Sequence, residues 1–228
     1  MLVLVYFSLI FKLIISKVKG ESPMKQSIID FLSERKSVRK FDSTVEIATK
    51  EIEGILTLAA KAPSGNNTQP WKVITVKNKE LKKQIQALAF NQKQLETASA
   101  MFLVFGDSDA YDIEHQISYK KETEQLSEER IQAFREKMES FYQLSPLDKG
   151  TEGLKLDCGL FAMNLLYAIR AYDYDAVPMR GADFEGIKKL LTIPSSWLPI
   201  VMIPFGKAVE SGRYKIRKSV TDFNRMIE

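Results

Sequence analysis

The chain has only one cysteine and one histidine, Cys158 and His115. A single cysteine excludes an internal disulfide and any metal site built from several cysteines, and it fits a reducing compartment. A single histidine removes most zinc and haem sites and most Ser-His-Asp arrangements. Cys158 lies within a helical apolar pattern that predicts a packing role, and His115 is expected at the surface. Any chemistry must therefore come from elsewhere.

A strong excess of one charge is also missing. The 33 basic residues are scattered among 29 acidic ones, for a formal net charge of +4. This pattern does not indicate a nucleic-acid surface, but it leaves small anions as partners. The sequence also lacks the glycine-rich fingerprint of dinucleotide-binding folds. With 45% apolar residues, its 228 residues are enough for one sizeable globular domain.

The N-terminal stretch MLVLVYFSLIFKLIISKVKG is the one compositional break. Its apolar run is interrupted by Lys12 and is shorter than the ~20 residues that a membrane-spanning helix needs. Its lysines lie within or after that run, whereas a secretory signal places them before it. We interpret residues 1–23 as an apolar extension, either a start assigned too early, with Met24 as the true beginning, or a weak membrane-associating tail. The folded domain is predicted at residues 24–228 in the cytoplasm, with membrane association through residues 1–20 as the less favoured alternative.

Downstream of Met24, helical and extended patterns alternate without repeats or a linker. One helix is predicted to start at an N-cap residue, Thr49, and to end at Pro63. A long apolar helix around Cys158 has apolar residues on more than one face, so we expect it to be buried, with a second subunit as one covering partner. This alternation predicts an α/β or α+β sandwich. The predicted helices cover residues 24–35, 49–62, 79–90 and 154–175 and most of 115–144, and the predicted strands cover 71–78, 100–107 and 198–206.

Two basic clusters lie at the edges of these elements. ERKSVRKF contains Arg35, Lys36, Ser37 and Arg39, and GRYKIRKS places Lys215 and Arg217 on one side of an extended segment. An arginine beside a hydroxyl suits a phosphate, because the guanidinium fork meets two oxygens while the hydroxyl donates to a third. Solvated charged surfaces are the alternative interpretation of both clusters.

A third segment, PSGNNTQPW at Pro63 to Trp71, places uncharged polar side chains between two prolines. Its residue types all favour turns, so a plain loop is one interpretation. Amides and hydroxyls without charge also suit a heterocycle that has donors and acceptors along its edge. We expect Trp71 to pack in the core.

Five blocks occur in one order along the chain, and together they resemble the nitroreductase family of FMN-dependent oxidoreductases. They are ERKSVRKF, APSGNNTQPW, FNQKQLETASAMFLVFGD, YDAVPMRGAD and GKAVESGRYKIR. The resemblance implies an α+β fold, a nitroreductase-like three-layer sandwich with a central, mainly antiparallel sheet flanked by helices. It also implies a homodimer that binds FMN in each of two clefts at the subunit interface, with NADH or NADPH as co-substrate.

The resemblance also implies which residues contact FMN. Arg35 and Ser37, with Lys36 between them, match one half of the phosphate site, and Lys215 and Arg217 match the other half. Arg39 matches a basic residue near the pyrimidine end of the flavin, where a fixed positive charge favours reduction.

The resemblance implies that the remaining matched residues contact the flavin ring. Asn91 matches an amide that bonds the ring, and Gln94 stands where some relatives have lysine. Arg180 and Gly181 match a pair beside flavin N5 that is often an acidic residue followed by glycine. Four residues of the polar loop would come from the partner subunit: Pro63, Ser64, Gly65 and Asn67.

The implied activity is hydride transfer from NADH or NADPH to the flavin, followed by electron transfer to a small electrophilic acceptor such as a nitroaromatic or a quinone, in a ping-pong sequence. This chemistry needs no catalytic side chain and no metal. Two alternatives remain open. The chain could be a flavin-binding regulatory protein without turnover, or a flavin-dependent dehydrogenase or dehalogenase on the same fold.

Overall fold

The structure is a computed structural model that describes residues 23–228. The apolar extension predicted at residues 1–23 therefore lies almost entirely outside the described residues. The chain divides into two units, residues 1–35 and residues 36–228, which are described separately. Within the first unit, helix α2 (Pro23–Glu34) confirms the helix predicted there.

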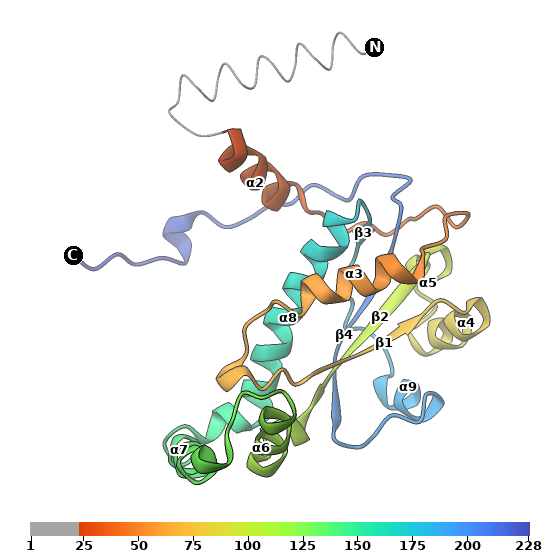
Figure 1. The fold of residues 1–228 in the computed structure, drawn as a ribbon. Coiled ribbons are helices and arrows are strands. Elements are labelled where there is room, and N and C mark those ends of the chain that lie inside the picture. Colours follow the sequence, from red (N-terminus) through yellow and green to blue (C-terminus); the bar gives the residue numbers. More distant parts are fainter. Residues whose placement is uncertain (1–22) are drawn as a thin grey trace. The chain divides into compact units, whose positions relative to one another are not determined.

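The second unit is built on an antiparallel sheet of four strands in the order β1-β2-β4-β3 (Figure 1). The long central strands β2 and β4 pair along most of their length, and β1 closes one edge through six pairs with β2. The strands are β1 (Trp71–Val76), β2 (Ala100–Asp107), β3 (Asp175–Ala176) and β4 (Trp197–Gly206).

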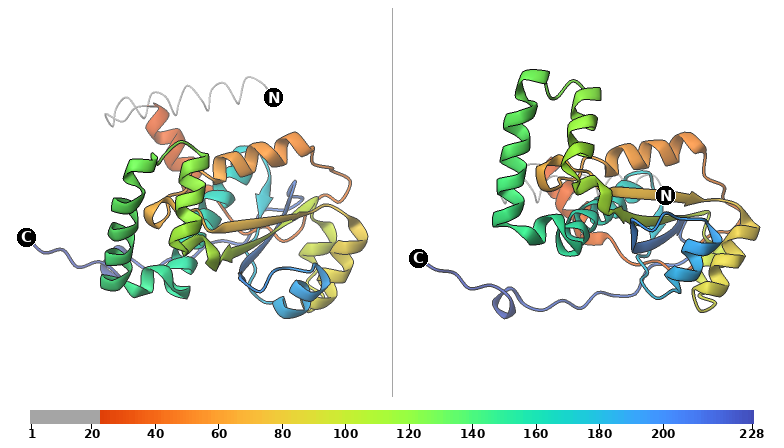
Figure 2. Two further views of the ribbon diagram at one scale, coloured as in Figure 1. Left: turned by 60° about the horizontal axis from the view of Figure 1, so that its bottom comes forward. Right: turned by 90° about the horizontal axis from the view of Figure 1, so that it is seen from below.

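Every residue of β2 is buried, because helices cover both faces of the sheet (Figure 2). Side chains alternate between the two faces of a strand. On one face, Phe102 and Val104 pack against buried side chains of helices α3 (Thr49–Ala59) and α8 (Thr151–Ala171). Leu103 and its alternate neighbours pack against α4 (Lys79–Leu88), α5 (Gln94–Thr97) and α9 (Phe184–Leu190). The predicted α+β three-layer sandwich is confirmed.

A β-bulge interrupts the pairing of β2 with β4. Val104 pairs with Val201, but the next residue, Phe105, pairs with Pro199. Ile200 is therefore the extra residue on β4. Bulges bend a strand locally and re-aim its side chains, which is why they occur next to binding sites.

Helices α6 (Ile113–Glu122) and α7 (Ile131–Leu144) form the predicted charged helical pair. Met138 and Tyr142 of α7 share a buried cluster with Leu154 and Cys158, which lie near the start of α8. The pair therefore covers the N-terminal part of the long helix, and its outer faces carry the charges.

Helix α8 confirms the long predicted helix and carries an exposed apolar stripe. Leu156, Leu160 and Met163 are 63%, 42% and 39% exposed, and their spacing of three and four residues places them on one face. Clustered apolar exposure of this kind marks an interaction surface more often than open solvent. Among the described residues, no helix is long and apolar enough to cross a membrane.

Two local predictions were wrong. Thr49 is not the N-cap of α3, because Ala48 occupies that position. The backbone N–H of Ala48 donates to Oε2 of Glu51 at 3.0 Å, so the side chain of a residue in the first turn provides the capping hydrogen bond. The helix also ends at Ala59, before Pro63, because a turn intervenes. The short elements α5, α9 and β3 were not predicted; β3 depends on its pairing with β4, and α5 and α9 pack against α4.

Candidate functional site

The segment that follows Arg35 is bound to the sheet on two sides. Ser37 forms a parallel bridge with Ala176 of β3, and the N–H of Val38 donates to the Ala176 carbonyl at 3.2 Å. On the other side, the N–H of Asp42 donates to the carbonyl of Lys207, just after β4. The basic cluster is therefore held on rigid elements, although its own residues form no regular structure.

Gly212 brings the second basic cluster to the first. A Cβ at this glycine would lie 2.7 Å from Cβ of Lys36 and 2.8 Å from the Ser37 carbonyl oxygen, so only glycine allows the chain to cross there. Next to the crossing, Nζ of Lys36 donates to Oγ of Ser211 at 3.1 Å.

The remaining members of the second cluster lie beyond the crossing. Lys215 and Arg217 follow Gly212 on a segment without regular secondary structure, in which Arg217 is exposed and donates to the Ile216 carbonyl at 2.9 Å. Within this unit, Ser211 and Gly212, at the start of the second cluster, therefore contact Lys36 and Ser37, whereas no contact of Arg217 with these two residues is seen among the described hydrogen bonds. Arg35 belongs to the first unit and is described with it.

Three cations of this region have no carboxylate partner among the described residues: Lys36, Arg39 and Arg180. The only hydrogen bonds that two of them make go to neutral oxygens, from Lys36 to Ser211 and from Arg39 to the Ser37 carbonyl at 3.3 Å. Cations that are not neutralised by the protein are suited to an anionic ligand, because charge-assisted bonds to it replace weaker contacts. The donor set fits a phosphate.

The segment after α4 that carries Asn91 and Gln94 contacts the segment after β3 that carries Arg180 and Gly181. Nε2 of Gln94 contacts Sδ of Met179 at 3.3 Å, and the neighbouring Gln92 donates to the Gly181 carbonyl at 2.8 Å. Asn91 lies exposed at a turn with a left-handed φ of 54°. Gln92 was missed by sequence reasoning, although it stands in the same amide-rich run, NQKQ, as Asn91 and Gln94.

The polar loop has an unusual backbone. Asn66, Asn67 and Gln69 have φ values of 50°, 57° and 49° around a short 3₁₀ turn, η1 (Gly65–Asn67). Asparagine adopts the left-handed region more readily than other non-glycine residues, which explains the choice of two asparagines here. The N–H of Gln69 donates to Oγ of Ser64 at 2.9 Å, so the loop is also closed on itself.

A buried carboxylate, Asp157 of α8, holds this loop. Its side chain is 6% exposed and accepts hydrogen bonds from the Gly65 N–H at 3.0 Å and the Tyr111 hydroxyl at 2.6 Å, with a longer one from Thr68 at 3.4 Å. Burial, and then the bond to Asp157, raise the pKa of Tyr111 far above its ordinary value, so Tyr111 stays a donor. Sequence reasoning missed Asp157; its signal was one acidic residue inside the apolar run LKLDCGLF.

The polar loop and the basic segment that carries Lys36 and Arg39 lie toward opposite ends of α8. The loop is bonded to Asp157 near the start of the helix, whereas β3, beside Ser37, follows the helix end, where the Tyr174 N–H bonds the Ile169 carbonyl. Roughly twelve residues at about 1.5 Å each separate the two points, or about 18 Å. Within one chain the structure does not bring the loop's Pro63, Ser64, Gly65 and Asn67 together with Lys36 and Arg39.

An apolar cleft of about 320 Å³ opens between α8 and the bulged part of β4. Pro178 and Arg180 line it, whereas Met179 between them is buried and pairs with Met202. We call it the Arg180 cleft. It is lined by Lys155, Gly159, Ala162, Met163, Leu166, Pro178, Arg180, Pro199, Ile200 and Val201.

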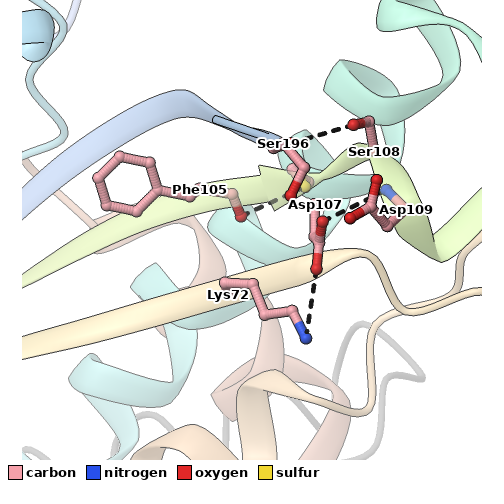
Figure 3. Close-up of polar contacts among 7 residues, drawn as sticks. Lys72, Phe105, Asp107, Ser108, Asp109 and Ser196 are labelled. Carbon is pink, nitrogen blue, oxygen red and sulfur yellow. Dashed lines mark hydrogen bonds and ion pairs between the residues drawn. The ribbon is translucent and has the colours of Figure 1, made fainter. Parts of the chain in front are cut away.

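A second, smaller cleft of about 220 Å³ lies between the polar loop and α6. It contains the exposed His115, as predicted for a surface residue, and Lys72 of β1. Figure 3 shows Lys72 directed at Asp107, at the end of β2, with Nζ 3.6 Å from Oδ2. Lys72 is therefore neutralised by a carboxylate, unlike the three cations described above.

Cys158 packs as predicted. It is fully buried, and burial raises the pKa of its thiol to about 12, so it carries no thiolate at neutral pH. Trp71 stacks on Phe161 with ring centroids 4.9 Å apart, which confirms its core role. The residues that the structure describes include no group of His, Cys, Asp or Glu side chains able to hold a metal ion.

Comparison with known proteins gives consistent results. The family model described as "Nitroreductase family" matches residues 32–207. Among curated proteins, YdgI of Bacillus subtilis (strain 168), whose name places it with the NAD(P)H nitroreductases, is 31% identical over 81% of this chain and 90% of its own length.

Solved structures give the same fold. A nitroreductase-like protein from Streptococcus mutans is 44% identical, with a TM-score of 0.86 over 90% of this chain and 100% of that one. A protein from Exiguobacterium sibiricum, solved in complex with FMN, is 30% identical, with a TM-score of 0.78 over 87% of this chain and 96% of that one.

Proposed function

The chain belongs to the nitroreductase family, and from this premise we propose that it is an FMN-dependent oxidoreductase that uses NADH or NADPH to reduce a small electrophilic acceptor, such as a nitroaromatic or a quinone. The observations that carry the proposal are two cations without a carboxylate partner, Lys36 and Arg39, on the segment bonded to β3, and a third, Arg180, which lines an apolar cleft. A phosphate and a flat ring are the two parts of FMN that such a site suits. The FMN-bound relative supports the same cofactor.

The residues divide by task. Arg35, Lys36, Ser37, Lys215 and Arg217 would bind the phosphate through charge-assisted bonds. Arg39 would place a fixed positive charge near the ring edge that becomes negative on reduction, which favours electron uptake. The ring itself would be oriented by amide and backbone groups of Asn91, Gln94, Arg180 and Gly181, together with the loop residues Pro63, Ser64, Gly65 and Asn67.

Bound FMN would supply the redox chemistry, taking electrons from the nicotinamide and giving them to the acceptor. The chain's own residues bind, orient and exclude water. No buried acid or base near the cations is required, which agrees with the packing role of Cys158 and the exposed position of His115.

We propose that the working form is a homodimer. The exposed stripe on α8, Leu156, Leu160 and Met163, supports this proposal, since a second copy would bury it. The C-terminal segment supports it too, because Ile216 and Phe223 are 84% and 71% exposed there. The separation of the polar loop from the cations has a simple explanation in a dimer, where the loop of one subunit completes the site of the other.

The proposed function predicts two separable half-reactions. Purified protein should show flavin absorbance in the visible range that bleaches when NADH or NADPH is added without oxygen, and 4-nitrobenzamide or menadione should restore it. A regulatory protein without turnover would keep its colour or stay bleached after the acceptor is added. A dehydrogenase would bleach with its own reduced substrate in place of either nicotinamide, whereas the reduced flavin of a dehalogenase would be re-oxidised by a halogenated compound and by neither of these acceptors.

Phosphate binding gives a second prediction. Arg217→Ala should weaken FMN binding by about 2 kcal/mol or more, because a charge-assisted bond to a desolvated anion is lost. The neighbouring Lys218→Ala is the matched control, because it removes one positive charge from the same exposed segment at a position outside the residues assigned to the phosphate, and it should change FMN affinity little. Fluorescence titration of the FMN-free protein measures both. Equal affinities in the two variants would remove Arg217 from the phosphate site.

A further inference from the structure

A third cleft, of about 300 Å³, lies beside α4 and α5, helices that cover the face of the sheet opposite α8. We call it the Lys82 cleft, and it is lined by Ser43, Lys79, Lys82, Lys83, Gln86, Leu95, Glu96, Thr97 and Ala98. It shares no lining residue with the Arg180 cleft or with the residues assigned to FMN. It also includes no residue of the α8 stripe or the C-terminal segment that the proposed dimer would bury.

Lys82 is the unusual residue of this cleft. It is only 7% exposed, and its Nζ donates to the Ala98 carbonyl at 2.5 Å. An ammonium group has three N–H donors, and within the described part of the chain Lys82 has neither a second acceptor nor a carboxylate partner. A buried charge is unfavourable unless an opposite charge accompanies it. The surroundings of Lys82 therefore suit a negatively charged ligand.

Further lysines add to the positive charge at the cleft. Lys79 and Lys83 lie three residues before and one residue after Lys82 on α4, and Lys79 is exposed, with no ion pair in the described ranges. Lys83 pairs with Glu80 at 3.7 Å, but both side chains are exposed, so this pair is weak. Desolvation, and then the charge of Lys79, lower the pKa of Lys82. One acid, the exposed Glu96, lines the cleft against these three lysines.

Neutral donors from two other segments complete the lining. The hydroxyl oxygen of Thr97 accepts a hydrogen bond from the N–H of Phe41 at 3.2 Å, which leaves the hydroxyl hydrogen to donate. The hydroxyl of Ser43 comes from the turn after Phe41. Donors that come from separate segments suit a tetrahedral oxyanion, because its oxygens point in several directions, better than a planar carboxylate.

We propose that the Lys82 cleft binds a phosphate group, either as the free ion or on a small phosphorylated molecule. Lys82 and Lys79 would supply the charge, and the hydroxyls of Ser43 and Thr97 would donate to the remaining oxygens. Leu95 would contact an organic body, for which the cleft has room. This is a second phosphate site, made of residues different from those proposed for the phosphate of FMN.

Affinity labelling with pyridoxal 5′-phosphate tests the site. The aldehyde of this probe condenses with a neutral lysine amine, with loss of water, and borohydride reduces the resulting imine to a stable secondary amine. The full-length protein is saturated with FMN, so that the other proposed phosphate site is filled, and peptide mass spectrometry locates the label. We expect the lysines of the cleft to react about tenfold faster with this probe than with pyridoxal, which lacks the phosphate.

Protection by unreactive anions distinguishes the two sources of phosphate. Inorganic phosphate and glycerol 2-phosphate are compared with acetate at the same ionic strength. Equal protection by the two phosphates identifies the free ion as the ligand, and stronger protection by the ester identifies a phosphorylated small molecule. Protection by neither, or equal protection by acetate, overturns the inference.

Variants assign the phosphate preference to the cleft. Lys79→Gln, at an exposed position, should lower the rate ratio of the two probes at Lys82 severalfold. Lys82→Gln should abolish the protection of Lys79 by phosphate, and Lys79→Gln keeps the test decisive if loss of the bond to Ala98 prevents Lys82→Gln from folding. Lys189→Gln removes one exposed charge on α9, outside the cleft, and is the control.

Three results would contradict the proposal. The first is a rate ratio near one in the unaltered protein. The second is an unchanged ratio in Lys79→Gln. The third is an equal fall in Lys189→Gln, since net charge alone would then cause the preference. Phosphate-dependent labelling at Lys36 or Lys215 instead of the cleft would also reject it, because the probe would then report the phosphate site proposed for FMN.

Discussion

Mixing two inactive variants, Asn67→Ala and Arg35→Ala, should restore activity. In the proposed dimer each site takes Asn67 from one subunit and the phosphate-binding arginine from the other. A mixed dimer then contains one intact site and one doubly altered site. The two-fold symmetry of the dimer limits the recovery to about half of the normal activity per mixed dimer.

The structural reason is the distance along α8. The polar loop is bonded to Asp157 near one end of this helix, and β3, beside the basic segment, follows the other end, about 18 Å away by helix rise. A loop that is bonded to Asp157 does not reach Lys36 and Arg39 of its own chain. Absorbance assays of nicotinamide oxidation measure the recovery, and native mass spectrometry verifies that mixed dimers have formed. Mixed dimers without recovery would place both residues in the same chain's site.

Replacing Asp157 should cause the largest loss of stability. Asp157→Ala leaves the Tyr111 hydroxyl and the Gly65 N–H without their acceptor, and the hydroxyl is buried. Donors left without a partner in this way cost about 3 kcal/mol together, as expected when one member of a buried polar network is removed. Urea denaturation at one fixed protein concentration measures the change.

The variant should also affect cofactor binding, because Asp157 fixes the backbone of the polar loop. Asp157→Asn, which keeps one acceptor oxygen, should fold better than Asp157→Ala and yet retain FMN less well than the unaltered protein. Glu152→Gln, on the exposed side of the same helix, is the control and should change stability by less than about 0.5 kcal/mol. A stable Asp157→Ala protein with normal FMN affinity would show that the loop is held by other contacts.

The elements that could be predicted from sequence are those whose own pattern determines them. The run AMFLVFGD predicts a buried strand because all its residues are apolar up to Asp107, and the structure buries every one. Helix α8 is long enough for its apolar pattern to decide its type. The two-residue strand β3 and helix α9 carry no such pattern, since their pairing and packing come from β4 and α4.

The candidate site divides in the same way. Local motifs identified the basic clusters and the polar loop, because the residue types within eight or nine consecutive positions indicate which ligand groups such a segment can bind. Asp157 was not predicted because its partners, Gly65 and Tyr111, lie 92 and 46 residues away in the chain. The lack of a carboxylate partner at Lys36, Arg39 and Arg180 among the described residues is likewise a property of the folded surface, and sequence alone does not indicate which charges remain without a partner.

The order of the strands also has a consequence for how the protein is made. β2 must lie between β1 and β4, but β4 is synthesised roughly a hundred residues later, since Ala100 pairs with Phe205. During that interval a ribosome-bound chain exposes one long edge of its most apolar strand. Contacts so distant in sequence form slowly, and unpaired apolar edges associate with other chains. The nascent chain is therefore expected to depend on chaperones until β4 has emerged from the ribosome.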